Sequence, residues 1–182
     1  MTPMQTRSRR LLATASITAF LTLIVAANWL TAEHGLVPVG FGLVATAGTW
    51  SAGLVLVARD LVHDASGRRA VLGCIAAGAG LSTLLATPQL AAASGAAFAV
   101  SELADYAVYA PLRRRGWARA VTASSVVGSA VDTVLFLALA GFPVWSAMPG
   151  QMLAKTTAIA AVVLPVVVAR AVLRNRLWTE GA

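Results

Sequence analysis

The stretch from Phe98 to Gly141, FAVSELADYAVYAPLRRRGWARAVTASSVVGSAVDTVLFLALAG, places two long apolar segments on either side of an arginine cluster. Glu102 and Asp105 precede the cluster and Asp132 follows it, each among residues that are otherwise soluble in lipid. A charged side chain inside a membrane costs several kcal/mol unless it faces a partner or a water-filled cavity. The three acids are therefore candidate functional residues.

The composition predicts an integral membrane protein. Of 182 residues, 58% are hydrophobic and 12% are charged, whereas roughly a quarter of the residues in a soluble domain are charged. The formal net charge of +7 comes from short basic clusters between apolar runs, which is typical of the cytoplasmic rim of a membrane protein and predicts no nucleic-acid partner. The single cysteine, Cys74, lies in an apolar run and is expected to be a packed core residue.

Apolar segments of membrane-spanning length predict one all-α domain, residues 1–182, built as a bundle of six transmembrane helices. The helices are expected near residues 11–30, 41–62, 70–87, 90–110, 119–141 and 148–170. The first segment has about 20 apolar-biased residues, enough to cross roughly 30 Å of hydrocarbon, and a signal peptide has a shorter apolar core.

This helix count places all thirteen arginines on one side of the membrane, whereas the loops on the other side have none. The arginines are Arg7, Arg9, Arg10, Arg59, Arg68, Arg69, Arg113, Arg114, Arg115, Arg119, Arg170, Arg174 and Arg176. Because cytoplasmic loops are enriched in Lys and Arg, both termini are predicted to be cytoplasmic in a bacterial inner-membrane protein that has the lipid bilayer as its partner.

Polar residues of the apolar segments predict a binding cavity. Counting about 1.5 Å per residue from the outer ends of their helices places Asp132 and Lys155 at similar depths, so that the two can form an ion pair. Glu102 and Asp105 share a helical face, and Trp50 at mid-span either lines a cavity or faces lipid. The predicted cavity residues are Asn28, Trp50, Glu102, Asp105, Tyr109, Ser129, Asp132 and Lys155.

A second polar group follows the expected helix 41–62. Arg59, Asp60, Asp64 and Arg68 are predicted to form a cytoplasmic network, either as salt bridges that fix a loop or in direct contact with the substrate. His63 has no second His or Cys at a spacing that completes a metal site, so no metal and no cofactor are expected.

Three functions fit the residues: a small-solute transporter, a substrate-binding subunit energised by a partner protein, or an intramembrane aspartyl protease with Asp105 and Asp132 as its dyad. The Tyr-Asp and Gly-x-Gly-Asp patterns of such proteases do not match this chain. The chain contains no phosphate-binding loop, Gly-x-Ser-x-Gly or His-Glu-x-x-His motif. The favoured prediction is a transporter and not an enzyme.

From Asn28 to Lys155 the sequence resembles the queuosine precursor transporter family, also called the VUT family. The marks are Ala27-Asn28, Val37-Pro38-Val39-Gly40, Asp60-Leu61 with Asp64, Gly67 and Arg68, Ser101 to Asp105, Ser124-Ser125, Ser129, Val131-Asp132-Thr133, Phe136 and Lys155. Three positions depart from the family, which usually has Glu at Asp64, Tyr at Ser66 and Gln at Glu102.

The resemblance implies a six-helix inner-membrane protein that imports 7-cyano- or 7-aminomethyl-7-deazaguanine. It implies that Glu102 or Asp105 accepts the N–H donors of the base, with Asp132 and Lys155 at its other edge. Asn28 would supply an amide, and an aromatic ring of Trp50, Phe98, Tyr106 or Tyr109 would stack on the base. The fold is also similar, more loosely, to the substrate-binding subunits of energy-coupling-factor transporters, so a homodimer and an energising subunit are both open as partners.

Overall fold

A computed structural model describes the backbone of residues 3–115 and 117–179, and the side chains of residues 10–112, 114, 115 and 123–165. Six helices dominate these residues, together with one short 3-10 helix and two strands. In chain order the elements are α1 (Pro3–His34), β1 (Leu36–Gly40), β2 (Leu43–Thr46), α2 (Thr49–Ser66), α3 (Arg68–Ser82), α4 (Pro88–Leu112), η1 (Arg113–Arg115), α5 (Trp117–Ala140) and α6 (Val144–Thr179).

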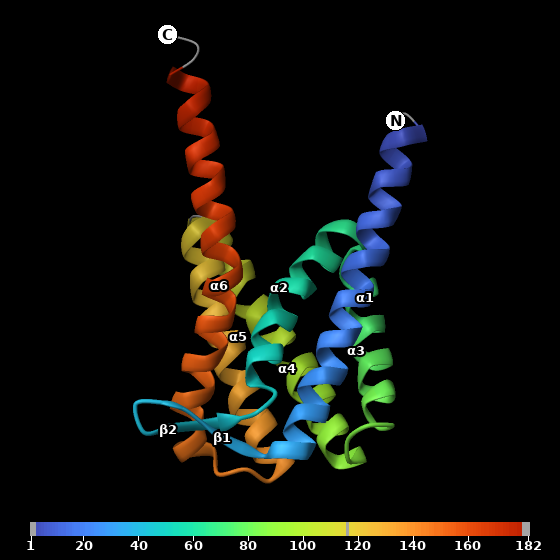
Figure 1. Ribbon diagram of the computed structural model, residues 1–182, viewed down its shortest axis with the longest axis vertical. Coiled ribbons are helices and arrows are strands. Elements are labelled where there is room, and N and C mark those ends of the chain that lie inside the picture. The colour runs from blue at the N-terminus through green and yellow to red at the C-terminus, as the bar shows by residue number, and fades with distance from the viewer. Residues whose placement is uncertain (1–2, 116, 180–182) are drawn as a thin grey trace.

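The helices run back and forth between two ends of the molecule. Both chain ends lie at one end, together with the α2–α3 junction (Figure 1). The β1–β2 hairpin and the α3–α4 and α5–α6 connections lie at the opposite end, called here the hairpin end (Figure 1). The structure therefore groups the ends of the helices as the distribution of arginines predicts, and the cytoplasmic location of the termini stays a prediction.

The prediction of a helix from residue 41 is wrong, because the chain first forms an antiparallel hairpin in which Leu36 lies opposite Thr46. Phe41 and Gly42 both have positive φ, 53° and 71°. Two such residues form the tight turn whose twist matches that of paired strands. Helix α2 begins only at Thr49, so the expected all-α fold carries one small β element at this end.

Three segments of the described residues are long and apolar enough to cross a membrane: Arg10–His34, Ala123–Ala140 and Val144–Pro165. Helix α3 has 15 residues and ends at Ser82, five residues before the predicted end, which gives it a length of about 22 Å at 1.5 Å per residue. A hydrocarbon core is about 30 Å thick. The structure thus contains six helices in a polytopic arrangement, but it does not confirm the prediction that all six are membrane spans.

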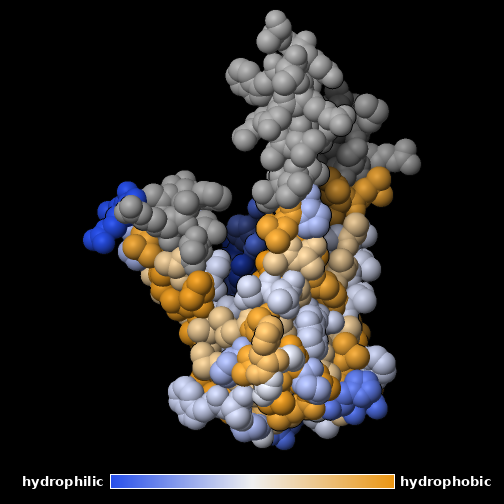
Figure 2. Space-filling view, turned by 60° about the vertical axis from the view of Figure 1, so that its left-hand side comes forward, coloured by the Kyte–Doolittle hydropathy of each residue, from blue (hydrophilic) through white to orange (hydrophobic). Residues whose placement is uncertain are grey.

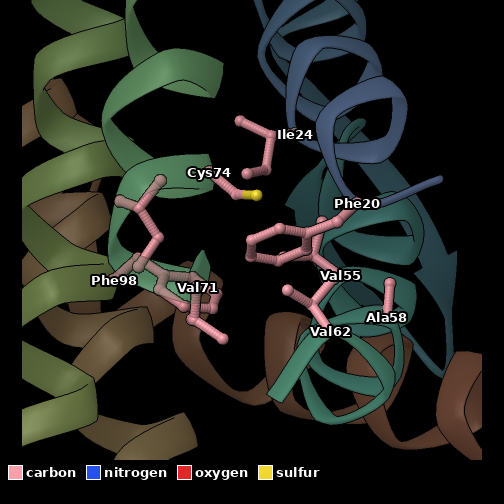
Figure 3. Packing of buried hydrophobic residues seen from close by; sticks show 9 residues of the cluster. Phe20, Ile24, Val55, Ala58, Val62, Val71, Cys74 and Phe98 are labelled. Carbon is pink, nitrogen blue, oxygen red and sulfur yellow. The ribbon is translucent and has the colours of Figure 1, made fainter. Parts of the chain in front are cut away.

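Helices α1 to α4 meet in a hydrophobic cluster that includes Phe20, Val55, Cys74 and Phe98 (Figure 3). The rings of Phe20 and Phe98 make an edge contact with centroids 5.9 Å apart, an arrangement favoured by the charge distribution of aromatic rings. Cys74 is buried in this cluster, which confirms its expected role as a core residue.

Large aromatic side chains are exposed at the hairpin end. Phe41 at the tip of the hairpin is 94% exposed, Trp145 in the first turn of α6 is 83% exposed, and Trp29 near the end of α1 is also exposed. Aromatic residues concentrate where a membrane meets water, since their rings prefer the level of the lipid headgroups. These side chains therefore fit a membrane boundary at the hairpin end.

Two glycines allow backbones to approach closely around the hairpin. A Cβ atom at Gly48 would lie 1.9 Å from the carbonyl oxygen of Ala27 in α1, and one at Gly150 would lie 2.1 Å from the carbonyl oxygen of Val44 in β2. Backbone atoms cannot move aside as the end of a flexible side chain can. The hairpin and the start of α2 are thus fixed against α6 and α1 at positions where only glycine fits.

Gly48→Ala and Gly150→Ala should each destabilise the folded protein by on the order of 3 kcal/mol, because the new methyl group overlaps backbone atoms. Thermal unfolding of the purified protein in detergent measures the effect as a lowered midpoint. Gly73→Ala is the matched control, since no atom lies within 4 Å of a Cβ atom there. Equal midpoints for Gly48→Ala and Gly73→Ala would contradict the close packing.

Candidate functional site

A cavity lies among the helices and reaches the base of the hairpin. Every helix and β2 contribute to its wall. The lining residues are Ile24, Ala27, Asn28, Thr31, Thr46, Gly48, Thr49, Ala52, Val55, Ile75, Ala79, Ser94, Gly95, Phe98, Asp132, Phe136, Gln151 and Lys155. The wall thus combines a few polar side chains with an apolar majority, as is usual for small-molecule sites.

An ion pair joins α5 to α6 at the cavity wall. Lys155 Nζ donates hydrogen bonds to Asp132 Oδ2 at 2.6 Å and to Thr133 Oγ1 at 2.8 Å. The side chains are 3% and 14% exposed for Lys155 and Asp132. Removal of two charges from water is repaid only when they are close together and otherwise hydrogen-bonded, and both conditions are met here. The ion pair predicted from the equal depths of these residues is confirmed.

A chain of hydrogen bonds links α6 to the hairpin one helical turn from Lys155. Gln151 Nε2 donates to Thr46 Oγ1 at 3.1 Å, and the hydroxyl groups of Thr46 and Thr49 are 2.9 Å apart. Thr49 Oγ1 donates its hydrogen to the carbonyl oxygen of Thr46, so the hydrogen between the two hydroxyls belongs to Thr46. This chain orients the Gln151 amide and ties the hairpin to the cavity.

Asn28 is held from two sides at the opposite wall. Its Nδ2 donates to the carbonyl oxygen of Ile24 at 3.2 Å and to Ser82 Oγ at 3.0 Å. Both hydrogens of the amide are then in use. Asn28 lines the cavity, and its carbonyl oxygen, Oδ1, has no hydrogen-bond donor among the described residues.

The hydrogen-bonding capacity left over defines what the cavity can recognise. Among the residues whose side chains are described, Asp132 Oδ1 and Asn28 Oδ1 have no hydrogen-bond donor, and Lys155 keeps the third of its ammonium hydrogens. Gln151 offers both kinds, because its Oε1 and its second amide hydrogen make no bond among the described residues. The cavity wall therefore offers both hydrogen-bond donors and acceptors to a polar solute.

Apolar side chains form the rest of the wall, with the rings of Phe98 and Phe136 among them. About 50 Å³ of the cavity is accessible to the centre of a water molecule, which corresponds to a few waters. A larger solute can enter only if side chains move.

A second ion pair lies beyond the cavity toward the end that holds the termini. Val55 of α2 and Phe98 of α4 line the cavity. Arg59 follows Val55 by four residues and Glu102 follows Phe98 by four, which is about 6 Å along each helix. Arg59 Nη1 binds Glu102 Oε1, and both side chains are 18% exposed. Arg59 also binds Asp60 at 2.9 Å. On the same side, a hollow with hydrophilic residues at its floor opens between the two arms of the molecule (Figure 2).

The other predicted site residues do not line this cavity. Trp50 is exposed, Glu102 pairs with Arg59, and Tyr109 is half-buried in α4. The Cβ atom of Asp105 lies where α4 packs closely on Gly128 of α5, and Ser129 Oγ donates to Met152 Sδ at 3.7 Å. The structure thus brings together Asn28, Asp132 and Lys155 of the eight predicted residues.

The predicted cytoplasmic network is divided in the structure. Arg59 and Asp60 are paired, whereas Asp64 is exposed and contacts only His63, at 4.0 Å, among the ion pairs of the described side chains. Arg68 lies over the ring of Tyr106 with its guanidinium carbon 5.1 Å from the ring centroid. This cation–π contact ties α3 to α4.

Five polar lining residues were not among the predicted site residues: Thr31, Thr46, Thr49, Ser94 and Gln151. Gln151 carried one usable signal, because it precedes Lys155 by four residues and so lies on the same helical face. Thr46 and Thr49 carried none, since threonines are common in strands and at helix starts.

A helical bundle with apolar, membrane-length helices and a partly polar internal cavity fits a membrane transporter. Residues 81–169, slightly under half of the chain, match the family described as putative vitamin uptake transporter. The match covers α4, α5 and most of α6 and confirms the resemblance to this family; the resembling residues from Ala27 to Arg68 lie outside the matched range. No curated protein and no solved structure matches the chain.

Asp132→Asn and Lys155→Met should each lower the free energy of unfolding by on the order of 3 kcal/mol, because each leaves one buried charge without its partner. The double variant should be more stable than either single variant, since it contains no unpaired charge. Thermal unfolding of the four proteins in detergent gives the interaction energy as a double-mutant cycle. Strictly additive changes would show that the pair contributes nothing.

Proposed function

We propose that the chain is a membrane importer of a flat, nucleobase-like solute, specifically a 7-deazaguanine base that carries a cyano or aminomethyl group. The observation that carries the proposal is the set of donors and acceptors that Asp132, Lys155, Asn28 and Gln151 direct at one small cavity. The match of residues 81–169 to a family of uptake transporters supports the transport part of the proposal.

The chemistry of the base fits the groups that the cavity leaves available. A guanine-like edge presents adjacent N–H donors beside a carbonyl acceptor. Asp132 Oδ1 and Asn28 Oδ1 accept from such donors, and the third hydrogen of Lys155 donates to the carbonyl oxygen; bonds to the two charged groups are the strong ones. The rings of Phe98 and Phe136 supply apolar surface for the faces of the base.

Two other functions differ from this proposal in testable ways. A substrate-binding subunit needs an energising partner, so uptake by this chain alone in a transport-deficient cell favours an autonomous transporter. An aspartyl protease needs Asp105 and Asp132 to share a proton. In the described residues Asp132 is bonded to Lys155 and not to Asp105, and this favours binding over catalysis.

The Arg59–Glu102 pair is proposed to close the cavity toward the end that holds the termini. It lies one helical turn beyond Val55 and Phe98 and joins α2 to α4 across the route out of the cavity. A solute released at this end requires the pair to separate. An exposed ion pair separates at little cost, whereas a largely buried one is held more firmly. The Arg59 and Glu102 side chains are largely buried, so their pair sets part of the barrier to release.

Asp132→Asn should abolish uptake of radiolabelled 7-cyano-7-deazaguanine and weaken its binding by at least about tenfold, because a charge-assisted acceptor is lost. Asp105→Asn is the matched control: it makes the same chemical change at an acid outside the cavity wall and should leave binding intact. Binding is measured on purified protein against guanine and unrelated vitamins. Wild-type binding by Asp132→Asn, or no binding of any base by the wild type, would refute the proposal.

Glu102→Gln should leave the affinity for the base within about twofold of the wild type but change the rate of uptake, because it weakens the closure without touching the cavity. Comparison of binding with initial rates of uptake in proteoliposomes separates the two effects. If Glu102 instead contacts the base, as the sequence predicted, affinity and rate will fall together.

A further inference from the structure

The charges at the cavity wall cancel. Among the lining residues, all of which have described side chains, Asp132 and Lys155 are the only charged ones. They face each other at 2.6 Å, so the negative charge of one is balanced by the other. The remaining polar lining side chains, which belong to Asn, Gln, Ser and Thr residues, are neutral.

A ligand with a net charge gains little from such a wall. It loses its hydration on entry, and a buried charge is compensated only by an opposite charge that is not already engaged. Asp132 can accept a hydrogen bond from a cation, but the ammonium group of Lys155 repels that cation from a neighbouring position. A neutral ligand loses less hydration and uses the same donors and acceptors in full.

The ion pair beyond the cavity does not change the balance of charge that a ligand meets. Arg59 and Glu102, four residues beyond the cavity on α2 and α4, also form a pair. The apolar residues between them and the polar groups, such as Val55 and Phe98, offer no charge to a ligand arm that extends toward that end.

We infer that the cavity selects an uncharged ligand and discriminates against a cationic congener of the same shape. The inference rests on the proposed function and makes its ligand specific. Of the two 7-deazaguanines, the cyano compound is neutral, whereas the aminomethyl compound carries an alkylammonium group at neutral pH. The cyano compound is therefore the ligand and the aminomethyl compound is the rejected congener.

The test titrates the purified full chain in nanodiscs with each of the two compounds and measures binding by isothermal titration calorimetry. The wild type should bind the cyano compound at least about tenfold more tightly than the aminomethyl compound, since only the latter has a charge to desolvate. Equal affinities, or tighter binding of the aminomethyl compound, overturn the inference and leave the proposed function standing. If neither compound binds, the proposed function fails and the inference falls with it.

Two variants test whether charge balance is the cause. Lys155→Met leaves the charge of Asp132 uncompensated, so the affinity ratio should shift toward the cationic compound by at least about tenfold. The double variant Asp132→Asn/Lys155→Met restores a neutral wall and should keep the wild-type direction of preference even where both affinities fall. An unchanged ratio in Lys155→Met overturns the inference. If Lys155→Met does not fold, a double variant that favours the cation overturns it equally.

Discussion

The buried ion pair between Asp132 and Lys155 is the interaction on which the site depends. Each charge lies near the middle of a segment that is apolar enough to cross a membrane, where an unpaired charge is costly. Their contact fixes the register of α5 against α6 and brings Thr133 into hydrogen-bonding distance of Lys155 Nζ. It also sets which face of α6 meets the cavity, and hence the position of Gln151 one turn earlier. The pair therefore joins α5 to α6 and also forms part of the cavity wall.

The cavity is enclosed by packing at one end and by charge at the other. At the hairpin end, Gly48 and Gly150 let backbones meet at distances that exclude any side chain, and Thr46 carries the hairpin's hydroxyl group to Gln151. At the opposite end, Arg59 reaches across to Glu102. A close backbone contact is rigid, whereas an ion pair between two side chains can exchange its partners for water. In the proposed transport function, this asymmetry makes the end that holds the termini the side that opens.

The structure changes the interpretation of Glu102, which stands where the family usually has Gln. As a residue of a binding cavity, an added carboxylate would change the charge offered to the substrate. Paired with Arg59 outside the cavity, it leaves the charge at the cavity wall unaltered and strengthens a contact between α2 and α4. Under the proposed function, the same substitution bears on release of the solute rather than on its identity, because a charge acts mainly on the groups within a few ångströms of it.

The sequence by itself determined the membrane class, the six helices, the grouping of helix ends by their arginines and the equal depth that lets Asp132 and Lys155 pair. These follow from hydropathy, from the distribution of charge and from counting residues along regular helices, all of which are local properties of the chain. The hairpin, the exclusion of Glu102 and Asp105 from the cavity, and the roles of Gln151 and Thr46 were decided only by the tertiary structure. Each depends on how the helices are rotated about their axes and how closely they pack. A residue's position along a helix specifies its depth but not which residue of the next helix it faces. Close approaches at glycines select among the possible rotations.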